Sequence, residues 1–171
     1  KIVRMGVFCM RKTIVSLLLV FLCSAMFAQS AAKITEIINT DKATYGQAAY
    51  LACVVKDLVK QDASEDSALE TLKASGVLPE NIQASDTLTM KKLAWICAST
   101  WEVKGSVMYR VFKNERYAFK QMRNASVIPD GTDPGKVPSG HELLNVITDC
   151  ISSYQLKTTD AAASSAPVIS R

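Results

Sequence analysis

Apolar residues recur at helical spacings of three and four in several short stretches of the chain, separated by polar turns. The stretches are too short and too often interrupted for long helices. The pattern predicts an all-α protein, a compact bundle of about five or six short helices. These helices are expected over residues 43–60 and 67–75, from Thr89, over 107–112 and 116–125, and from Ser139.

Part of this pattern is repeated at an offset of fifty positions. Residues 72–79 read LKASGVLP, and residues 122–129 read MRNASVIP. A Thr or Ser, Thr89 or Ser139, then opens a helix in each copy, and Thr44 opens a more distant third copy at an offset of 45. Such periods are typical of helical units that bury their apolar faces by stacking. We therefore expect imperfect repeats joined by short extended Val-Leu-Pro and Val-Ile-Pro connectors, with Gly76 as a helix stop.

The second copy leads from a helix through Val127-Ile128-Pro129-Asp130-Gly131-Thr132 to the helix start Ser139-Gly140-His141-Glu142. This order resembles the S-layer homology module, in which a helix leads through an extended step and a Pro-Asp-Gly-Thr loop to a Thr-Arg-Ala-Glu helix start. The resemblance covers residues 68–98 and 116–152. It implies a compact helical envelope module whose helix-start Arg and Glu, with loop residues, help to bind anionic cell-wall polysaccharide.

The two helix starts depart from that motif. The first reads Thr89-Met90-Lys91-Lys92, without Arg or Glu, and the second keeps Glu142 but has no Arg. Lys or His cannot reproduce the bidentate contact of a guanidinium. The resemblance thus supports the fold more than the ligand. The stretch 108–119, followed by an Asp-Pro-Gly turn, is similar to segments of spirochaete envelope proteins.

The first thirty residues have the order of a secretory signal peptide: a basic pair, an apolar run over 14–23 and small residues after it. Met10 is a plausible initiator. Cys23 would suit a lipid anchor, but the bulky Leu22 before it disfavours one. We predict a signal peptide over 1–30, a single helical repeat domain over 31–156 and a disordered tail over 157–171, in a protein exported to the periplasm or cell envelope without a stable membrane span.

The net charge of the chain does not indicate a binding partner. Four of the 20 basic residues lie in the leader, which has no acid, so the rest of the chain is formally neutral, with 16 basic and 16 acidic residues. Binding to nucleic acid or to an anionic membrane would require a clustered basic surface. The net charge therefore supports neither.

The three cysteines after the leader, Cys53, Cys97 and Cys150, each come late in an apolar helical pattern. We interpret them as core residues, with one bridged pair as the alternative. The chain has no CxxC motif and a single histidine, His141, so we expect neither a metal nor another cofactor.

Catalytic patterns are weak. Ser139 and Glu142 fit a capping box, and His141 falls on the solvent side of its helix. No Gly-x-Ser-x-Gly turn accompanies the histidine, which leaves a small periplasmic hydrolase as the weakest functional alternative.

One region brings basic and aromatic residues together and is the preferred candidate for a ligand or partner surface. The alternative is that its aromatic residues lie in the core and its bases in water. The candidate residues are Tyr109, Arg110, Arg116, Tyr117, Lys120 and Arg123, with Glu142 added from the helix start.

These observations favour an exported, non-enzymatic protein of the envelope or periplasm that acts by contact with a cell-wall polymer or another envelope protein. The alternative is a structural or interaction subunit of an outer-membrane or periplasmic assembly.

Overall fold

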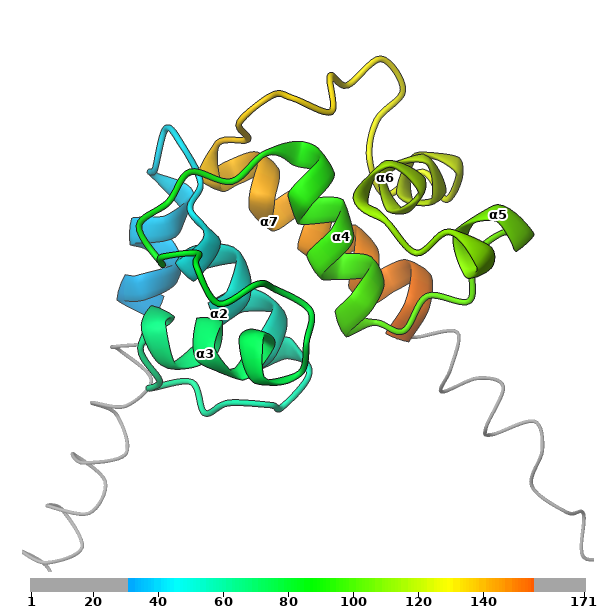
Figure 1. Cartoon of the computed structure of the whole chain (residues 1–171). Helices are drawn as coiled ribbons and strands as arrows, with labels where there is room; N and C mark the ends of the chain where they lie inside the picture. Colours follow the sequence, from blue (N-terminus) through cyan, green and yellow to red (C-terminus); the bar gives the residue numbers. More distant parts are fainter. Residues whose placement is uncertain (1–30, 156–171) are drawn as a thin grey trace, which may run out of the picture. The chain divides into compact units, whose positions relative to one another are not determined.

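The computed structural model describes residues 31–155 of the chain. The predicted signal peptide and the predicted C-terminal tail lie outside the described residues. The compact unit that carries the repeats begins at Ile37, and its helices are labelled in Figure 1.

The unit is built from short helices, and the all-α prediction is confirmed. Among the described residues, the only extended pairing is an isolated antiparallel bridge between Thr44 and Thr87. No helix in this part of the chain has both the length and the apolar character needed to cross a membrane. Residues 31–38 are helical. The labelled helices are α2 (Tyr45–Val55), α3 (Glu65–Ala74), α4 (Met90–Thr100), α5 (Val107–Val111), α6 (Glu115–Asn124) and α7 (Gly140–Cys150), and a π-helical turn (Ile151–Gln155) follows α7.

The helices pack in pairs around one apolar core. Helix α2 packs against α3, and α4 against α6; α7 contacts both α2 and α4, while α5 lies on α6 (Figure 1). The region from Tyr45 to Cys53 is buried without interruption, so α2 is the most enclosed helix. The helices other than α2 each bury one face, so none of these pairs could enclose the core alone. Representative fully buried side chains are Tyr50, Leu72, Leu93, Met122 and Leu143.

The three copies of the helix start meet in an incomplete ring of backbone hydrogen bonds. The residues that precede the three N-caps are Ala43, Leu88 and Pro138, and all are buried. The N–H of Leu88 donates to the carbonyl oxygen of Ala43 at 2.9 Å, and the N–H of Ala43 donates to that of Pro138 at 2.8 Å. Pro138 has no N–H, so it cannot donate the bond that would complete the ring.

In each copy, the helix that follows the N-cap also donates a backbone bond to the segment that leads into the next copy. The N–H of Tyr45 in α2 donates to Asp86 O, and the N–H of Met90 in α4 donates to Lys136 O. The N–H of Gly140 in α7 donates to Thr40 O, in the segment that precedes the first copy. These bonds satisfy N–H groups that a helix cannot pair internally. The relation is cyclic, because the third copy bonds back to the segment that precedes the first.

Four helices end in the same way. The residue after each C-cap takes a left-handed conformation: Asp57 (φ 53°), Gly76 (73°), Glu102 (47°) and Ser126 (59°). The following N–H bonds back across the last turn, as in a Schellman motif. Gly76 is thus the predicted stop. The first helix ends at Val55, earlier than residue 60, and the Leu58 side chain is 53% exposed.

The helix caps agree with the sequence at two of three copies. Thr44 with Gln47, and Ser139 with Glu142, form complete capping boxes. Thr89 occupies the N-cap of α4, but its side chain makes no capping bond and its hydroxyl has no partner. Thr89 therefore opens its helix, as the sequence predicts, but without capping it through the side chain. The residue at its N3 position, Lys92, has no oxygen to complete a box and pairs instead with Glu115 on α6.

Candidate functional site

Helix α5 presents an apolar face to solvent. Val107 is 72% exposed, Val111 65%, Met108 52% and Phe112 51%. These four positions are spaced so that they share one side of the short helix. They are most of the large apolar side chains that remain exposed in the described chain, where the others are mostly buried.

The contacts beneath α5 explain why this face points outward. Tyr109 is 5% exposed and anchors the helix in the core. A Cβ at Gly105 would lie 2.7 Å from the Tyr109 ring, so the backbone approaches Tyr109 as closely as glycine permits. The N–H of Ser106 donates to Gln121 Oε1 on α6 at 2.9 Å. With Tyr109 inward, the opposite side of the helix must face solvent.

One aromatic contact joins the end of α5 to α6. The Phe112 and Tyr117 rings stack with centroids 5.9 Å apart and planes at 25°. Tyr117 is half-buried, so the stack gives the exposed Phe112 a fixed support. This contact limits how far the apolar face can move relative to α6.

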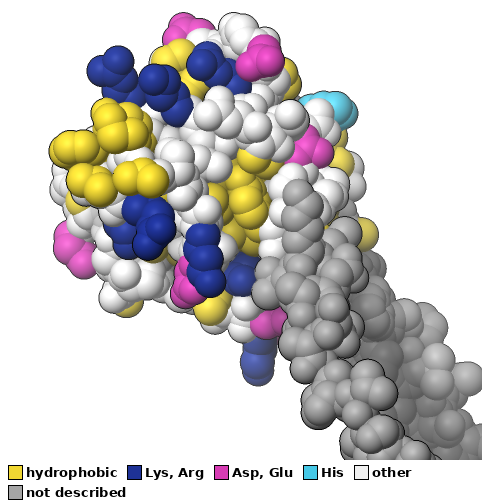
Figure 2. Space-filling view, turned by 90° about the vertical axis from the view of Figure 1, so that its right-hand side faces the viewer, with side chains coloured by type: hydrophobic (Ala, Val, Ile, Leu, Met, Phe, Trp, Pro, Cys, Tyr) yellow, Lys and Arg dark blue, Asp and Glu magenta, His cyan; other side chains and the backbone are white. Residues whose placement is uncertain are grey.

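Basic side chains surround the apolar face. Residues 103–129 contain six basic residues and one acid, Glu115, which pairs with Lys92. Figure 2, which views the side of the molecule that carries α5, shows hydrophobic side chains gathered on the surface with Lys and Arg side chains beside them. We call this region the α5 surface. It comprises Val107, Met108, Val111 and Phe112 with the exposed bases Lys104, Arg110, Lys113, Arg116 and Lys120, none of which forms an ion pair with another described residue.

The structure separates the residues that the sequence grouped as a candidate surface. Arg110, Arg116 and Lys120 are exposed on the α5 surface. Tyr109 lies in the core, as the alternative interpretation expected for the aromatic residues. Arg123 is half-buried, and its Nε lies 3.7 Å from Asp130 Oδ1. Tyr117 supports Phe112 from below.

Glu142 caps the start of α7. Its carboxylate accepts from Lys136 Nζ at 2.5 Å and from the N–H of Ser139 at 3.0 Å. The bond from Lys136, followed by that from the Ser139 N–H, lowers the pKa of Glu142. The carboxylate is thus already engaged by its own loop.

Sequence reasoning missed the four apolar residues as a surface. It predicted a short amphipathic turn or helix there, but periodicity shows only which residues share a face, not which face is buried. The neighbouring excess of bases is no signal either, because Tyr109, Phe119 and Met122 lie in the same stretch and are buried.

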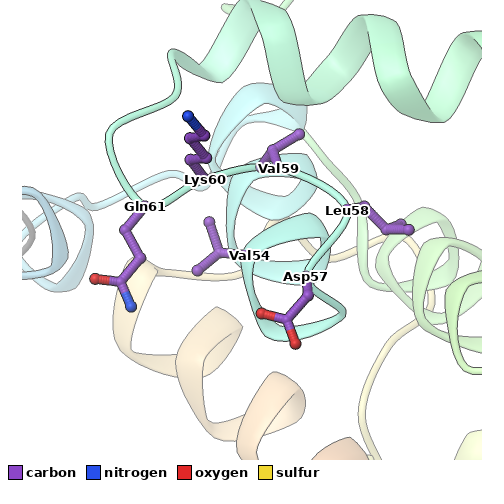
Figure 3. A pocket seen from close by; sticks show the side chains of 6 residues that line it. All are labelled: Val54, Asp57, Leu58, Val59, Lys60 and Gln61. Atoms are coloured by element: carbon purple, nitrogen blue, oxygen red, sulfur yellow. The ribbon is translucent and has the colours of Figure 1, made fainter.

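The groups that could support catalysis do not converge. His141 is exposed, and its Nδ1 lies 3.2 Å from Asn145 Nδ2. Among the described residues, no cluster of three His, Cys, Asp or Glu side chains could hold a metal ion. An open depression at the end of α2 is lined by Val54, Asp57, Leu58, Val59, Lys60 and Gln61. In Figure 3 the Asp57 and Lys60 side chains point away from each other.

The cysteines are buried and free, in the core positions predicted for them. The Cys53 thiol donates to Ala68 O at 3.7 Å, and burial raises its pKa to about 11. The Cys97 thiol is hydrogen-bonded to Cys150, and this bond together with burial raises the pKa of Cys97. Thiols held in the protonated form are poor nucleophiles.

Comparison of the chain with protein-family models, with curated proteins and with solved structures returned no match.

Proposed function

We propose that this chain is an exported, non-enzymatic protein of the periplasm or cell envelope that acts by contact with another envelope component. The α5 surface is the part that makes the contact. The observation that carries the proposal is the exposure of four large apolar side chains on α5 and its C-cap residue Phe112. Contiguous apolar patches rimmed by polar groups commonly mark interaction sites.

The chemistry of the α5 surface suits binding. Its bases and apolar side chains can hold an anionic or amphipathic partner, whereas general acid–base catalysis needs a group that titrates near the working pH and a positioned reactant. Glu115, the one acid within residues 103–129, is paired with Lys92. Contact is therefore a better account of this surface than catalysis.

The cyclic arrangement of the three helix starts supports an interpretation as S-layer-homology-like repeats. The helix starts themselves offer little for the polysaccharide contact that this resemblance implies. Glu142 is held by Lys136, and Lys92 is held by Glu115. We assign the repeats a scaffold role that fixes α5 and α6 in place.

Sedimentation tests the proposal. The protein, purified after expression with its own leader, is mixed with isolated bacterial envelopes and with sacculi stripped of lipid and protein. The test variant carries Val107→Ser, Met108→Ser, Val111→Ser and Phe112→Ser, and the control carries Leu58→Ser, another exposed apolar residue far along the chain.

We expect the wild type and the control to sediment with envelopes and the α5 variant to bind at least about tenfold more weakly, because the lost side chains supply most of the apolar contact. Circular dichroism checks that all three proteins keep their helices. Equal sedimentation of the α5 variant and the wild type would refute the proposal. Binding to stripped sacculi would identify a wall polymer as the partner.

A further inference from the structure

We propose that the partner of the α5 surface is the face of an anionic phospholipid bilayer, into which α5 inserts its apolar side chains. This inference rests on the proposed function and names the partner. It concerns peripheral attachment by a short surface helix, which leaves the fold outside the membrane.

The arrangement of side chains fits a lipid interface. An interfacial helix keeps one face apolar and carries Lys and Arg beside it, so that the bases reach the lipid headgroups while the apolar groups enter the acyl boundary. In α5, Val107 and Val111 are the most exposed apolar residues, and Arg110 lies on the same helix. Lys104 and Lys113 flank it in sequence and are exposed.

The charge distribution points to an anionic surface. The chain after the leader is formally neutral, so attraction to anionic lipid must come from local clustering. The α5 surface supplies five bases that form no ion pair with another described residue, and Glu115, the one acid within residues 103–129, is paired with Lys92. Each Lys or Arg near an anionic bilayer strengthens adsorption by about fivefold.

The same features fit a protein partner less well. Lys is depleted in protein interfaces relative to the rest of the surface, whereas Lys104, Lys113 and Lys120 are exposed in the same stretch of chain as the apolar residues. Long basic side chains are common beside interfacial helices, because their stems cover apolar surface while their charged ends remain in water. The helix that carries most of the apolar face has only five residues, so the area it can bury is small for a stable protein interface.

Insertion would not require unfolding. Tyr109, Gly105 and the bond from Ser106 to Gln121 hold α5 to α6 from below. The stacked Phe112 and Tyr117 rings stiffen its far end, and Tyr rings favour the membrane–water interface. The helix is thus already exposed in the orientation needed for insertion.

Vesicle flotation tests the inference with the protein purified after expression with its own leader, as in the sedimentation test. The vesicles contain phosphatidylcholine alone or phosphatidylcholine mixed with phosphatidylglycerol. The charge variant carries Lys104→Gln, Arg110→Gln and Lys113→Gln, the apolar variant is the four-serine variant described above, and the control carries Leu58→Ser with Lys60→Gln. All share the same N-terminus, so differences between them report α5 alone.

We expect the wild type and the control to float with the anionic vesicles and to bind the neutral vesicles at least about tenfold more weakly. Loss of three bases should weaken anionic binding about a hundredfold, and high salt should weaken it because the charges are screened. The apolar variant should lose at least about tenfold. Absence of binding to anionic vesicles, or equal binding by either variant and the wild type, would overturn the inference.

The two proposals fail in different ways. If the wild type ignores vesicles while the four-serine variant still loses binding to envelopes, the partner is a protein or a wall polymer, and only the lipid inference falls. If that variant binds envelopes like the wild type, the proposed function itself falls.

Discussion

The backbone N–H of Ala43 donates to the carbonyl oxygen of Pro138 at 2.8 Å. This bond joins the first copy of the helix start to the third, although the two residues lie far apart in the sequence. The matching bond from Leu88 to Ala43 joins the second copy to the first. Both donors lie at positions that are fully buried. The ring therefore depends on all three copies being in place, because no single copy supplies its own partner.

This dependence predicts slow amide exchange at the ring. The Ala43 and Leu88 amides should exchange only through global unfolding, with protection matching the free energy of unfolding measured in urea. Arg110, whose amide bonds to Ser106 O within the short α5, should exchange faster by local opening. Native-state exchange followed by NMR measures all three amides. A rapidly exchanging Ala43 beside a protected Leu88 would mean that the first and third copies separate on their own.

Gly140 lies so close to the backbone of Ile37 that a side chain there should strongly lower the stability of the fold. A Cβ there would overlap the carbonyl oxygen of Ile37, so Gly140→Ala should destabilise the fold by about 3 kcal/mol or more, despite the higher helix propensity of alanine. A Cβ on Gly135 in the preceding loop would meet no atom nearer than 3.5 Å. Gly135→Ala should change stability by less than about 0.5 kcal/mol. Urea unfolding followed by circular dichroism compares the two; similar midpoints would contradict the close approach.

The repeated helix ends predict that substitutions at two equivalent positions change stability in opposite directions. Ser126 has φ 59° where the first copy has Gly76 at φ 73°. A side chain is strained in this conformation, so Ser126→Gly should stabilise the protein by about 0.5–1 kcal/mol, and Gly76→Ser should destabilise it by a similar amount. Nothing lies within 4 Å of a Cβ placed on Gly76, so backbone strain alone sets the second effect. Chemical denaturation gives both values. A stabilising Gly76→Ser would disprove the left-handed stop.

Local signals in the sequence predicted the starts and stops of most helices. Thr44 and Ser139 cap their helices through side chains three positions apart, and Gly76 ends α3 by its own conformational freedom. Such features depend on neighbours in sequence, so a sequence pattern can show them. The end of α2 was harder to predict, because Asp57 takes a left-handed conformation without being glycine.

The orientation of α5 and the ring of copies could not be predicted in the same way. Whether the face with Val111 or the face with Tyr109 is buried depends on Gly105 and on Gln121, which lies 15 residues from its partner Ser106. The bond between Ala43 and Pro138 spans an even longer separation. Periodicity carries no information about which distant segment covers a face.

The cap of α7 predicts a specific dependence of stability on pH. The pKa of Glu142 is lowered in the folded state, chiefly by Lys136 and then by the Ser139 N–H. The stabilisation from its charge is therefore present above the unfolded pKa, about 4.3, and is lost as the pH falls through the lower folded value. Glu142→Gln keeps an oxygen for the Ser139 N–H but removes the charge. At neutral pH this variant should have a lower urea midpoint than the wild type, and the difference should vanish in acid.

Two further variants isolate the charge from the cap. Ser139→Ala removes the hydroxyl that accepts from the Glu142 N–H at 3.2 Å and should cost about 1 kcal/mol. Glu80→Gln, in an exposed loop, changes the net charge by the same amount as Glu142→Gln and should leave a nearly constant difference from the wild type at every pH. Urea unfolding at a series of pH values from acid to neutral measures all of them. If the Glu142→Gln difference persisted unchanged into acid, the Lys136 contact would contribute nothing to stability and the carboxylate would act only as a cap.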